Sequence, residues 1–156
     1  MLDCPAQGFF TEEERVEGRR TGFMMNSLDN ERGYLAHQDI PSPVRVRRYG
    51  VSVENIERIA VRSIEPGDGT VVILDEIGKM ECFSLKFREA AVRALGSANI
   101  VVGTVTLGGD DFIKSVKGRD DIEIIEVTPE NRNRLPEMIL EKIHGLQRER
   151  MVYQLF

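Results

Sequence analysis

Two adjacent carboxylates, Asp75 and Glu76, are the side chains of this sequence whose surroundings best suit them for chemistry. They follow the apolar run 71–74, which is too short for a helix and has glycines on either side. Such a run predicts a strand that is buried on both faces. In open parallel sheets, ligands bind just beyond the carboxyl ends of the strands. The sequence therefore predicts a ligand site at Asp75 and Glu76.

A buried strand that ends in Asp-Glu is typical of a Walker B segment. In such a segment the aspartate steadies a nucleotide-bound Mg²⁺, and the glutamate polarises the water that attacks the terminal phosphate. The alternative interpretation is a strand followed by an ordinary polar turn. Because short motifs have many false matches, this stretch by itself leaves both interpretations open.

The composition is that of a globular protein and argues against several other classes. With 156 residues, 41% of them hydrophobic and 30% charged, the chain is long enough for one domain with a substantial core. A net charge of −5 argues against a general nucleic-acid binder, whose surface is usually basic. Cys4 and Cys82 are far apart, which gives neither metal-ligand spacing nor a disulfide framework. Neither a signal-peptide pattern nor an apolar stretch of about 20 residues occurs, so we expect a cytoplasmic protein.

The first third of the chain predicts a small antiparallel layer. Short strand-like runs with turn residues between them occupy residues 7–38. Strands this close in sequence pair antiparallel, since parallel neighbours need a crossover of roughly a dozen residues or more. A linker with two prolines then leads to a further predicted strand at 44–51. The predicted hairpin layer therefore spans about residues 7–51.

From residue 52 to about residue 147 the apolar pattern predicts helices that alternate with strands. Ser52 and Ser84 are predicted N-caps, and Thr128 with Pro129 is predicted to open the last helix, because proline suits the first helical position. This alternation predicts a parallel sheet covered by helices. The other predicted elements are helices at 52–64, 83–95 and 110–117, and strands at 71–74, 100–105 and 122–127.

The sequence contains no phosphate-binding loop. Nucleotide-hydrolysing α/β domains hold the phosphates with a glycine-rich loop between a strand and a helix. The pattern Gly-x-x-x-x-Gly-Lys-Ser/Thr does not occur, because Gly78 and Lys79 lack its first glycine and its hydroxyl residue, and Gly109 replaces the lysine after Gly108. The chain also opens on the hairpin layer, without the βαβ unit of roughly 30 residues that carries such a loop.

Five segments, in this order along the chain, carry a resemblance to a known family. Together they resemble the THEP-type nucleoside-triphosphatases, known in vertebrates as the cancer-related nucleoside-triphosphatase. The resemblance extends from Pro5 to about His144. The segments are Gly-Phe-Phe-Thr-Glu-Glu at 8–13, Gly-Arg-Arg-Thr-Gly-Phe at 18–23, Tyr-Gly-Val-Ser-Val at 49–53, Leu-Asp-Glu-Ile-Gly-Lys-Met-Glu at 74–81 and Glu-Val-Thr-Pro-Glu-Asn-Arg-Asn-Arg-Leu-Pro at 126–136.

The resemblance implies an α/β fold of the RecA-like P-loop NTPase type, with a mainly parallel sheet, flanking helices and an N-terminal antiparallel hairpin layer. It implies hydrolysis of ATP, GTP and other nucleoside triphosphates, with Mg²⁺ as the cofactor. By position, Glu76 would be the general base, and Asp75 would hold Mg²⁺ through water. The other residues that the resemblance places at the nucleotide are Ile73, Leu74, Ile77, Gly78, Lys79 and Asn131.

Some of these residues have an equally simple structural interpretation. Lys79 either faces phosphate or is a surface lysine that follows a strand. Asn131 and Arg132 lie either beside a bound base or at the start of the last helix, and we favour the helix start. The loop 106–111 differs from the usual family residues, which leaves a polarising role for Thr104 or Thr106 without support.

The family begins with a strand, a phosphate-binding loop and a helix, which this sequence lacks. We therefore expect residues 1–156 to be a single nucleoside-triphosphatase domain, incomplete at its N-terminus, that hydrolyses nucleotides poorly or not at all. In RecA-like sheets the missing strand lies beside the strand that matches 100–105, so we also expect an exposed apolar strand edge. The alternative is a catalytically dead nucleotide- or partner-binding module of the same fold.

A third hypothesis, nucleic-acid binding by the arginines of the hairpin layer, is the weakest because the chain is acidic. These arginines are Arg19, Arg20, Arg45, Arg47 and Arg48.

Overall fold

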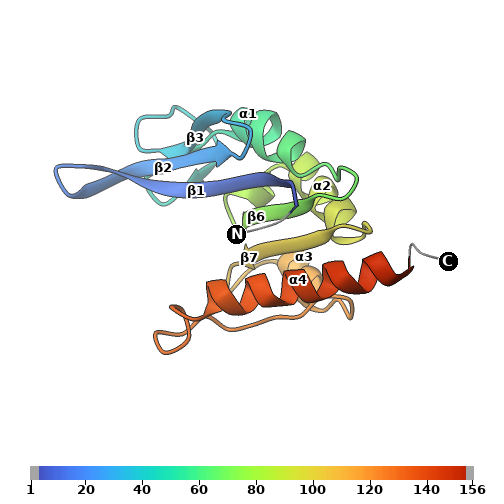
Figure 1. The fold of residues 1–156 in the computed structure, drawn as a ribbon. Coiled ribbons are helices and arrows are strands. Elements are labelled where there is room, and N and C mark those ends of the chain that lie inside the picture. The colour runs from blue at the N-terminus through green and yellow to red at the C-terminus, as the bar shows by residue number, and fades with distance from the viewer. Residues whose placement is uncertain (1–3, 154–156) are drawn as a thin grey trace. The chain divides into compact units, whose positions relative to one another are not determined.

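The chain folds around a seven-stranded sheet whose strand order is β4-β5-β3-β2-β1-β6-β7 (Figure 1). The structure is a computed structural model that describes residues 4–153, with side chains described up to residue 148. What the sequence predicts for residues 1–3 lies outside this part of the chain. The described residues form two compact units, residues 4–118 and residues 119–153, and the sheet belongs to the first of them.

The antiparallel half of the sheet has the predicted hairpins. At the first turn Glu17 and Gly18 both have positive φ, 49° and 76°, as a two-residue hairpin turn requires. The stretch 44–51, predicted as one strand, is instead a tight hairpin, because Arg47 has a φ of 53° and reverses the chain. The strands of this half are β1 (Ala6–Val16), β2 (Arg19–Ser27), β3 (Arg32–His37), β4 (Arg45–Val46) and β5 (Tyr49–Val51).

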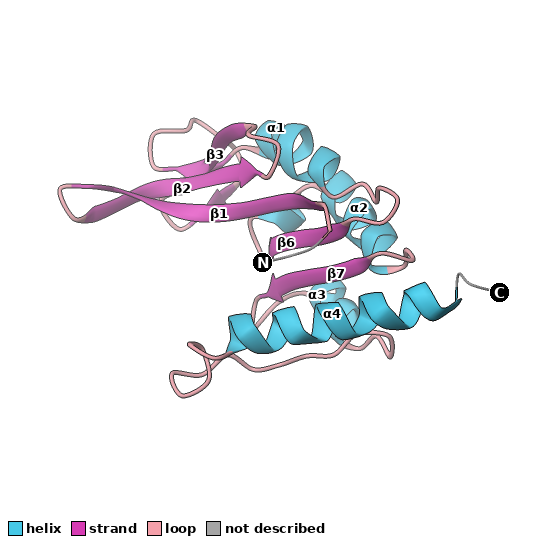
Figure 2. Ribbon diagram, in the orientation of Figure 1, coloured by secondary structure: helices cyan, strands magenta, loops and turns pink. Residues whose placement is uncertain are grey.

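The strand β1 joins this half to the parallel half of the sheet (Figure 2). Its first residues, 6–9, pair parallel with β6 (Val71–Ile77), whereas residues 9–16 pair antiparallel with β2. On its other side β6 pairs parallel with β7 (Ile100–Val105). The hairpin strands and the predicted Asp-Glu strand therefore lie in one mixed sheet, in which β6 is an inner strand.

The helices of the first unit begin at the predicted polar residues. Ser52, Ser84 and Asp110 each accept a hydrogen bond from a backbone amide of the helix that follows. Such an amide has no partner within its own helix, so the capping side chain fixes where the helix starts. The helical elements are α1 (Val53–Asn55), its π-helical continuation η1 (Ile56–Val61), the 3₁₀ turn η2 (Glu81–Phe83), α2 (Leu85–Leu95) and α3 (Asp111–Lys117).

The core of this unit lies between the sheet and these helices. Phe9 of β1 and Phe87 of α2 are fully buried, with ring centroids 5.9 Å apart in an edge-to-face arrangement. Leu74 of β6 and Ile56 of η1 belong to the same buried cluster. Burial of this apolar surface holds the strand that carries Asp75 and Glu76 in a fixed position. Within residues 4–153, no helix combines the length and the apolar character that a bilayer crossing needs.

The second unit lacks a predicted strand. Residues 122–127, predicted as a strand from their alternating isoleucines and glutamates, have no regular structure. No strand of the described chain pairs with them. Because a strand persists only where a neighbour satisfies its backbone hydrogen-bonding groups, the alternating pattern was insufficient and the prediction was wrong.

The last helix, α4 (Leu135–Tyr153), begins later than predicted. Thr128 and Pro129 precede it, and the Thr128 carbonyl accepts hydrogen bonds from the amides of Asn131 and Arg132 in a turn. The proline in the first turn of α4 is Pro136, where the missing amide costs no helical hydrogen bond. The sequence offers two prolines for this position, and the turn at Thr128 excludes the first.

Gly8 lies against the backbone of Ile73 in β6, and replacing it tests this close contact. It has a φ of +123°, and an added β-carbon would overlap the carbonyl oxygen of Ile73 and lie 2.7 Å from the Ile73 amide nitrogen. We expect Gly8→Ala to lower the free energy of unfolding by about 3 kcal/mol or more, since it combines a backbone clash with strain. Thermal unfolding followed by circular dichroism measures this loss.

Gly18→Ala is the matched control, because Gly18 also has a positive φ, of +76°, but no atom within 4 Å of an added β-carbon. It adds strain without a clash and is expected to cost about 1 kcal/mol. Equal destabilisation by the two substitutions would contradict the close approach of β1 and β6.

Candidate active site

Asp75 is held by both strands that flank β6. Its Oδ1 atom accepts a hydrogen bond from the Thr104 hydroxyl of β7 at 2.6 Å, and its Oδ2 atom accepts one from the Thr11 amide of β1 at 3.4 Å. The strand order explains both contacts, because β6 lies between β1 and β7. The carboxylate is partly exposed and keeps lone pairs that water or a cation can use.

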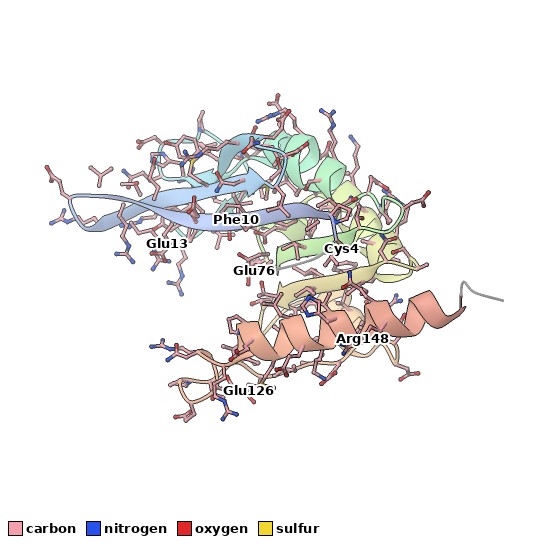
Figure 3. All side chains as sticks on the ribbon, viewed as in Figure 1. Cys4, Phe10, Glu13, Glu76, Glu126 and Arg148 are labelled. Carbon is pink, nitrogen blue, oxygen red and sulfur yellow. The ribbon has the colours of Figure 1, made fainter. Side chains whose placement is uncertain are left out.

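Glu76 follows Asp75 near the end of β6 and is half-buried (Figure 3). The peptide bond between the two residues is cis. Burial raises the pKa of the Glu76 carboxyl group, and repulsion from Asp75 raises it further. No hydrogen bond from the described residues offsets these two effects. A carboxylate with a raised pKa is a better proton acceptor near neutral pH, which is what a general base requires.

Thr104 is a site residue for which sequence reasoning found no support. Its hydroxyl donates to Asp75, as described above, and so fixes one carboxylate oxygen. Thr106, the other residue considered, lines a neighbouring pocket, and its amide donates to the carbonyl of Ile77. The position of Thr104 on the strand next to β6 could have indicated this contact, because parallel strands end at the same edge of a sheet.

The loop after β6 adds a third carboxyl group, that of Glu81. Its side chain is only 2% exposed. An ideal β-carbon on Gly78 would lie 2.5 Å from Glu76 Oε1 and 2.7 Å from Glu81 Oε2. Two carboxyl oxygens therefore converge on the space that the absence of a side chain at Gly78 leaves free. No periodic pattern in the sequence indicates this burial, since Glu81 begins the short 3₁₀ turn η2 after β6.

The remaining predicted residues of this stretch divide into core and surface. Leu74 and Ile77 are buried in the hydrophobic core, and Ile73 is partly buried beside them in β6. Lys79 is exposed and lines a pocket of about 560 Å³. The pocket is also lined by Cys82, Phe83, Arg88, Thr106 and Gly108. Asp75, Glu76, Gly78 and Lys79 thus lie together at one end of β6, which follows from their being close in sequence.

Asn131 belongs to the second unit and has a structural task there. Its side-chain oxygen accepts from the Thr128 amide at 2.8 Å, and its side-chain nitrogen donates to the Glu126 carbonyl at 2.8 Å. These bonds hold the turn that precedes α4. The favoured interpretation of Asn131 and Arg132 as residues at the approach to the last helix agrees with this turn.

Several arginines of the hairpin layer are likewise engaged within the fold. Arg45 donates to the backbone carbonyls of Ile40 and Arg48, and Arg48 donates to the carbonyl of Arg20. The Arg48 guanidinium also lies 5.1 Å from the centre of the Tyr49 ring. Guanidinium groups used in this way have fewer donors left for phosphate, which weakens the nucleic-acid hypothesis.

The donor set at Asp75 suits Mg²⁺. This ion prefers oxygen ligands and is usually bound by one or two carboxylates together with waters and substrate phosphates. Asp75 offers carboxylate oxygens at an open end of β6, with the Thr104 hydroxyl beside them. The described residues contain no cluster of three or more His, Cys, Asp or Glu side chains that would form an all-protein metal cage. Burial raises the pKa of Cys82 to about 12, so this thiol stays protonated and is a poor ligand.

Comparison with known proteins places this architecture in a family. A family model described as NTPase matches residues 1–140. This chain belongs to the NTPase family. Among its relatives, the nucleoside-triphosphatase THEP1 of Thermotoga sp. (strain RQ2) is 44% identical over 137 residues, which cover 86% of this chain and 79% of that protein. The human cancer-related nucleoside-triphosphatase is 34% identical over 146 residues, which cover 84% of this chain and 77% of that protein.

Two solved structures of the NTPase family have the same fold. THEP1 from the hyperthermophile Aquifex aeolicus superposes with a TM-score of 0.74 at 33% identity, and the match covers 88% of this chain and 81% of that one. The solution structure of a human cancer-related nucleoside triphosphatase gives 0.76 at 34% identity, with 91% and 83% covered. The fold is therefore that of a P-loop NTPase, and the family resemblance read from the five sequence segments is confirmed.

Proposed function

We propose that this chain carries the catalytic carboxylates of a nucleoside-triphosphatase that hydrolyses ATP, GTP and other nucleoside triphosphates to the diphosphate and phosphate. The proposal rests on membership of the NTPase family and on the names of its relatives. The single observation that carries the mechanism is the pairing at the end of β6: Asp75 is held from both sides, whereas Glu76 is half-buried and free to accept a proton.

Asp75 is proposed to hold Mg²⁺ through water. An ion held there would supply positive charge against the negative charge that develops during phosphoryl transfer. The hydrogen bonds from Thr11 and Thr104 fix the orientation of the Asp75 carboxylate. They leave it partly exposed, as an aspartate needs to be if it is to contact water molecules around a cation.

Glu76 is proposed to be the general base. It accepts a proton from the water whose oxygen forms the new bond to the γ-phosphorus, while the bond from that phosphorus to the bridging oxygen breaks and the nucleoside diphosphate leaves. The raised pKa of Glu76 supports this task, because a more basic carboxylate removes the proton more readily.

Metal dependence tests the proposal. We expect phosphate release from ATP, GTP, CTP and UTP to require Mg²⁺, and Asp75→Asn to raise the Mg²⁺ concentration for half-maximal release by roughly tenfold or more. The assay uses the chain extended by the codons that precede it in frame, provided that they encode a phosphate-binding loop. Nucleotide binding without phosphate release would instead support the catalytically dead module, and release that is independent of Asp75 would contradict the metal assignment.

A further inference from the structure

The carboxyl group of Glu81 is a buried ionisable group that the proposed reaction does not use. Glu81 is 2% exposed at the start of η2 and ranks among the fully buried side chains of the core. Burial is the largest of the causes that raise its pKa to about 8, and repulsion from Glu76 and Asp75 adds to it. At neutral pH this carboxyl group is therefore predominantly neutral, and its one O–H donor needs a hydrogen-bond acceptor.

One oxygen of this group has no partner. The backbone amides of Gly78 and of Glu81 itself act on the carboxyl group in the direction that lowers its pKa, but burial outweighs them. The Oε2 atom is buried and makes no hydrogen bond to any residue in the described part of the chain. Buried polar atoms are nearly always paired, and an unpaired one costs about 1–3 kcal/mol. The missing partner of Oε2 therefore needs an explanation.

The position of Oε2 relative to Gly78 narrows the choice of partner. As the Gly78 geometry above shows, Glu81 Oε2 and Glu76 Oε1 both point into the space beside the Gly78 Cα atom, on the side where a β-carbon would stand. A side chain at position 78 would displace one or both of these oxygens from their present positions. The acidic groups that act on Glu81 from β6 are Glu76 and Asp75, so an O–H on Oε2 faces an acceptor.

We propose that Glu81 is a positioning residue for Glu76, donating a hydrogen bond from Oε2 to the Glu76 carboxylate, directly or through one water. The contact keeps Glu76 turned toward the attacking water. This inference rests on the proposed role of Glu76 as the general base. An ionised Glu81 would repel Glu76, so the contact depends on the neutral donor and not on negative charge at position 81.

Two substitutions separate the donor from the charge. In Glu81→Gln the amide oxygen takes the place of one carboxyl oxygen, and the NH₂ group can donate to Glu76 as the O–H did. Glu81→Leu has a similar volume and no donor. We expect Glu81→Gln to keep kcat within about threefold and Glu81→Leu to lower kcat by about 10- to 100-fold, with the nucleotide KM unchanged in both.

Stability distinguishes positioning from a merely structural role. We expect Glu81→Leu to melt at the same temperature as the unsubstituted protein or higher, because it replaces an unpaired buried carboxyl group with an apolar one. Glu89→Gln and Glu89→Leu, on the exposed face of α2, are the matched controls and should leave kcat unchanged. Full kcat in Glu81→Leu, or equal losses of kcat in Glu81→Gln and Glu81→Leu, would overturn the proposal.

A second measurement does not depend on turnover. Carbon-13 NMR of the carboxyl groups in this chain should show Glu81 neutral at pH 7, and the Glu76 signal should move in Glu81→Leu but stay in place in Glu81→Gln. If these NMR signals behave as expected but the protein hydrolyses no nucleotide, the contact between Glu81 and Glu76 is supported and only the proposed function is contradicted. A Glu81 signal that is ionised at pH 7, or a Glu76 signal that ignores Glu81→Leu, would refute the contact.

Discussion

Glu76→Gln is expected to lower nucleotide turnover by about 10²- to 10⁴-fold, the range that a positioned general base contributes. Glutamine has nearly the shape of glutamate but cannot accept the proton of the attacking water. The half-buried position of Glu76 limits the access of bulk water, which would otherwise replace it as a base. Single-turnover phosphate release, measured with enzyme in excess over nucleotide, reports the chemical step directly.

Nucleotide affinity should change little in Glu76→Gln, because the general base acts in the transition state and not in ground-state binding. Equilibrium binding of a nucleotide with Mg²⁺ measures this affinity. Glu89→Gln removes an exposed carboxylate of α2 in the same way and serves as the control. If Glu76→Gln keeps its turnover, the general-base assignment is wrong, although the chain still belongs to the NTPase family.

The second large effect concerns the phosphate-binding loop. We expect the 156-residue chain alone to hydrolyse nucleotides at least about 100-fold more slowly than the same chain joined to a strand, loop and helix that carry Gly-x-x-x-x-Gly-Lys-Ser/Thr. Phosphoryl transfer depends almost wholly on positioning and on charge stabilisation. In the proposed mechanism Asp75 would hold the metal and Glu76 would be the base, and neither residue would hold the β- and γ-phosphates.

The comparison uses two polypeptides that share residues 1–156, the second extended upstream along its reading frame. A variant of the longer polypeptide in which the loop lysine is changed to alanine is the control, and it should behave like the shorter one. Turnover by the 156-residue chain that equals that of the longer polypeptide would show that the loop is dispensable. Absence of the motif upstream would favour the partner-binding alternative.

Local sequence signals were sufficient for the elements of the first unit. The N-caps at Ser52 and Ser84 and the Asp-Glu strand depend on residues that are neighbours in sequence, so a pattern finds them. The strand predicted at 122–127 fails because its pairing depends on a partner that no local pattern specifies. The choice between Pro129 and Pro136 as the first-turn proline depends on a turn held by the side chain of Asn131.

The candidate site was predictable in part for the same reason. The local pattern identifies Asp75 and Glu76, because two carboxylates directly follow an apolar run. The structure places both at the end of an inner strand. Thr104 is 29 residues from Asp75 in sequence and becomes its partner only through strand order. A glutamate in a short turn is expected at the surface, and Glu81 is buried only because of the packing around η2.

The continuous strand β1 has a mechanical consequence. Its backbone belongs at once to the hairpin arm and to the contact at Asp75, where the Thr11 amide donates to the carboxylate. The turn at Glu17 and Gly18 closes the same hairpin at its other end. The Thr11 amide and the turn residues that follow Val16 thus lie on one unbroken length of backbone, which ties the placement of the Asp75 carboxylate to that of the β1–β2 hairpin.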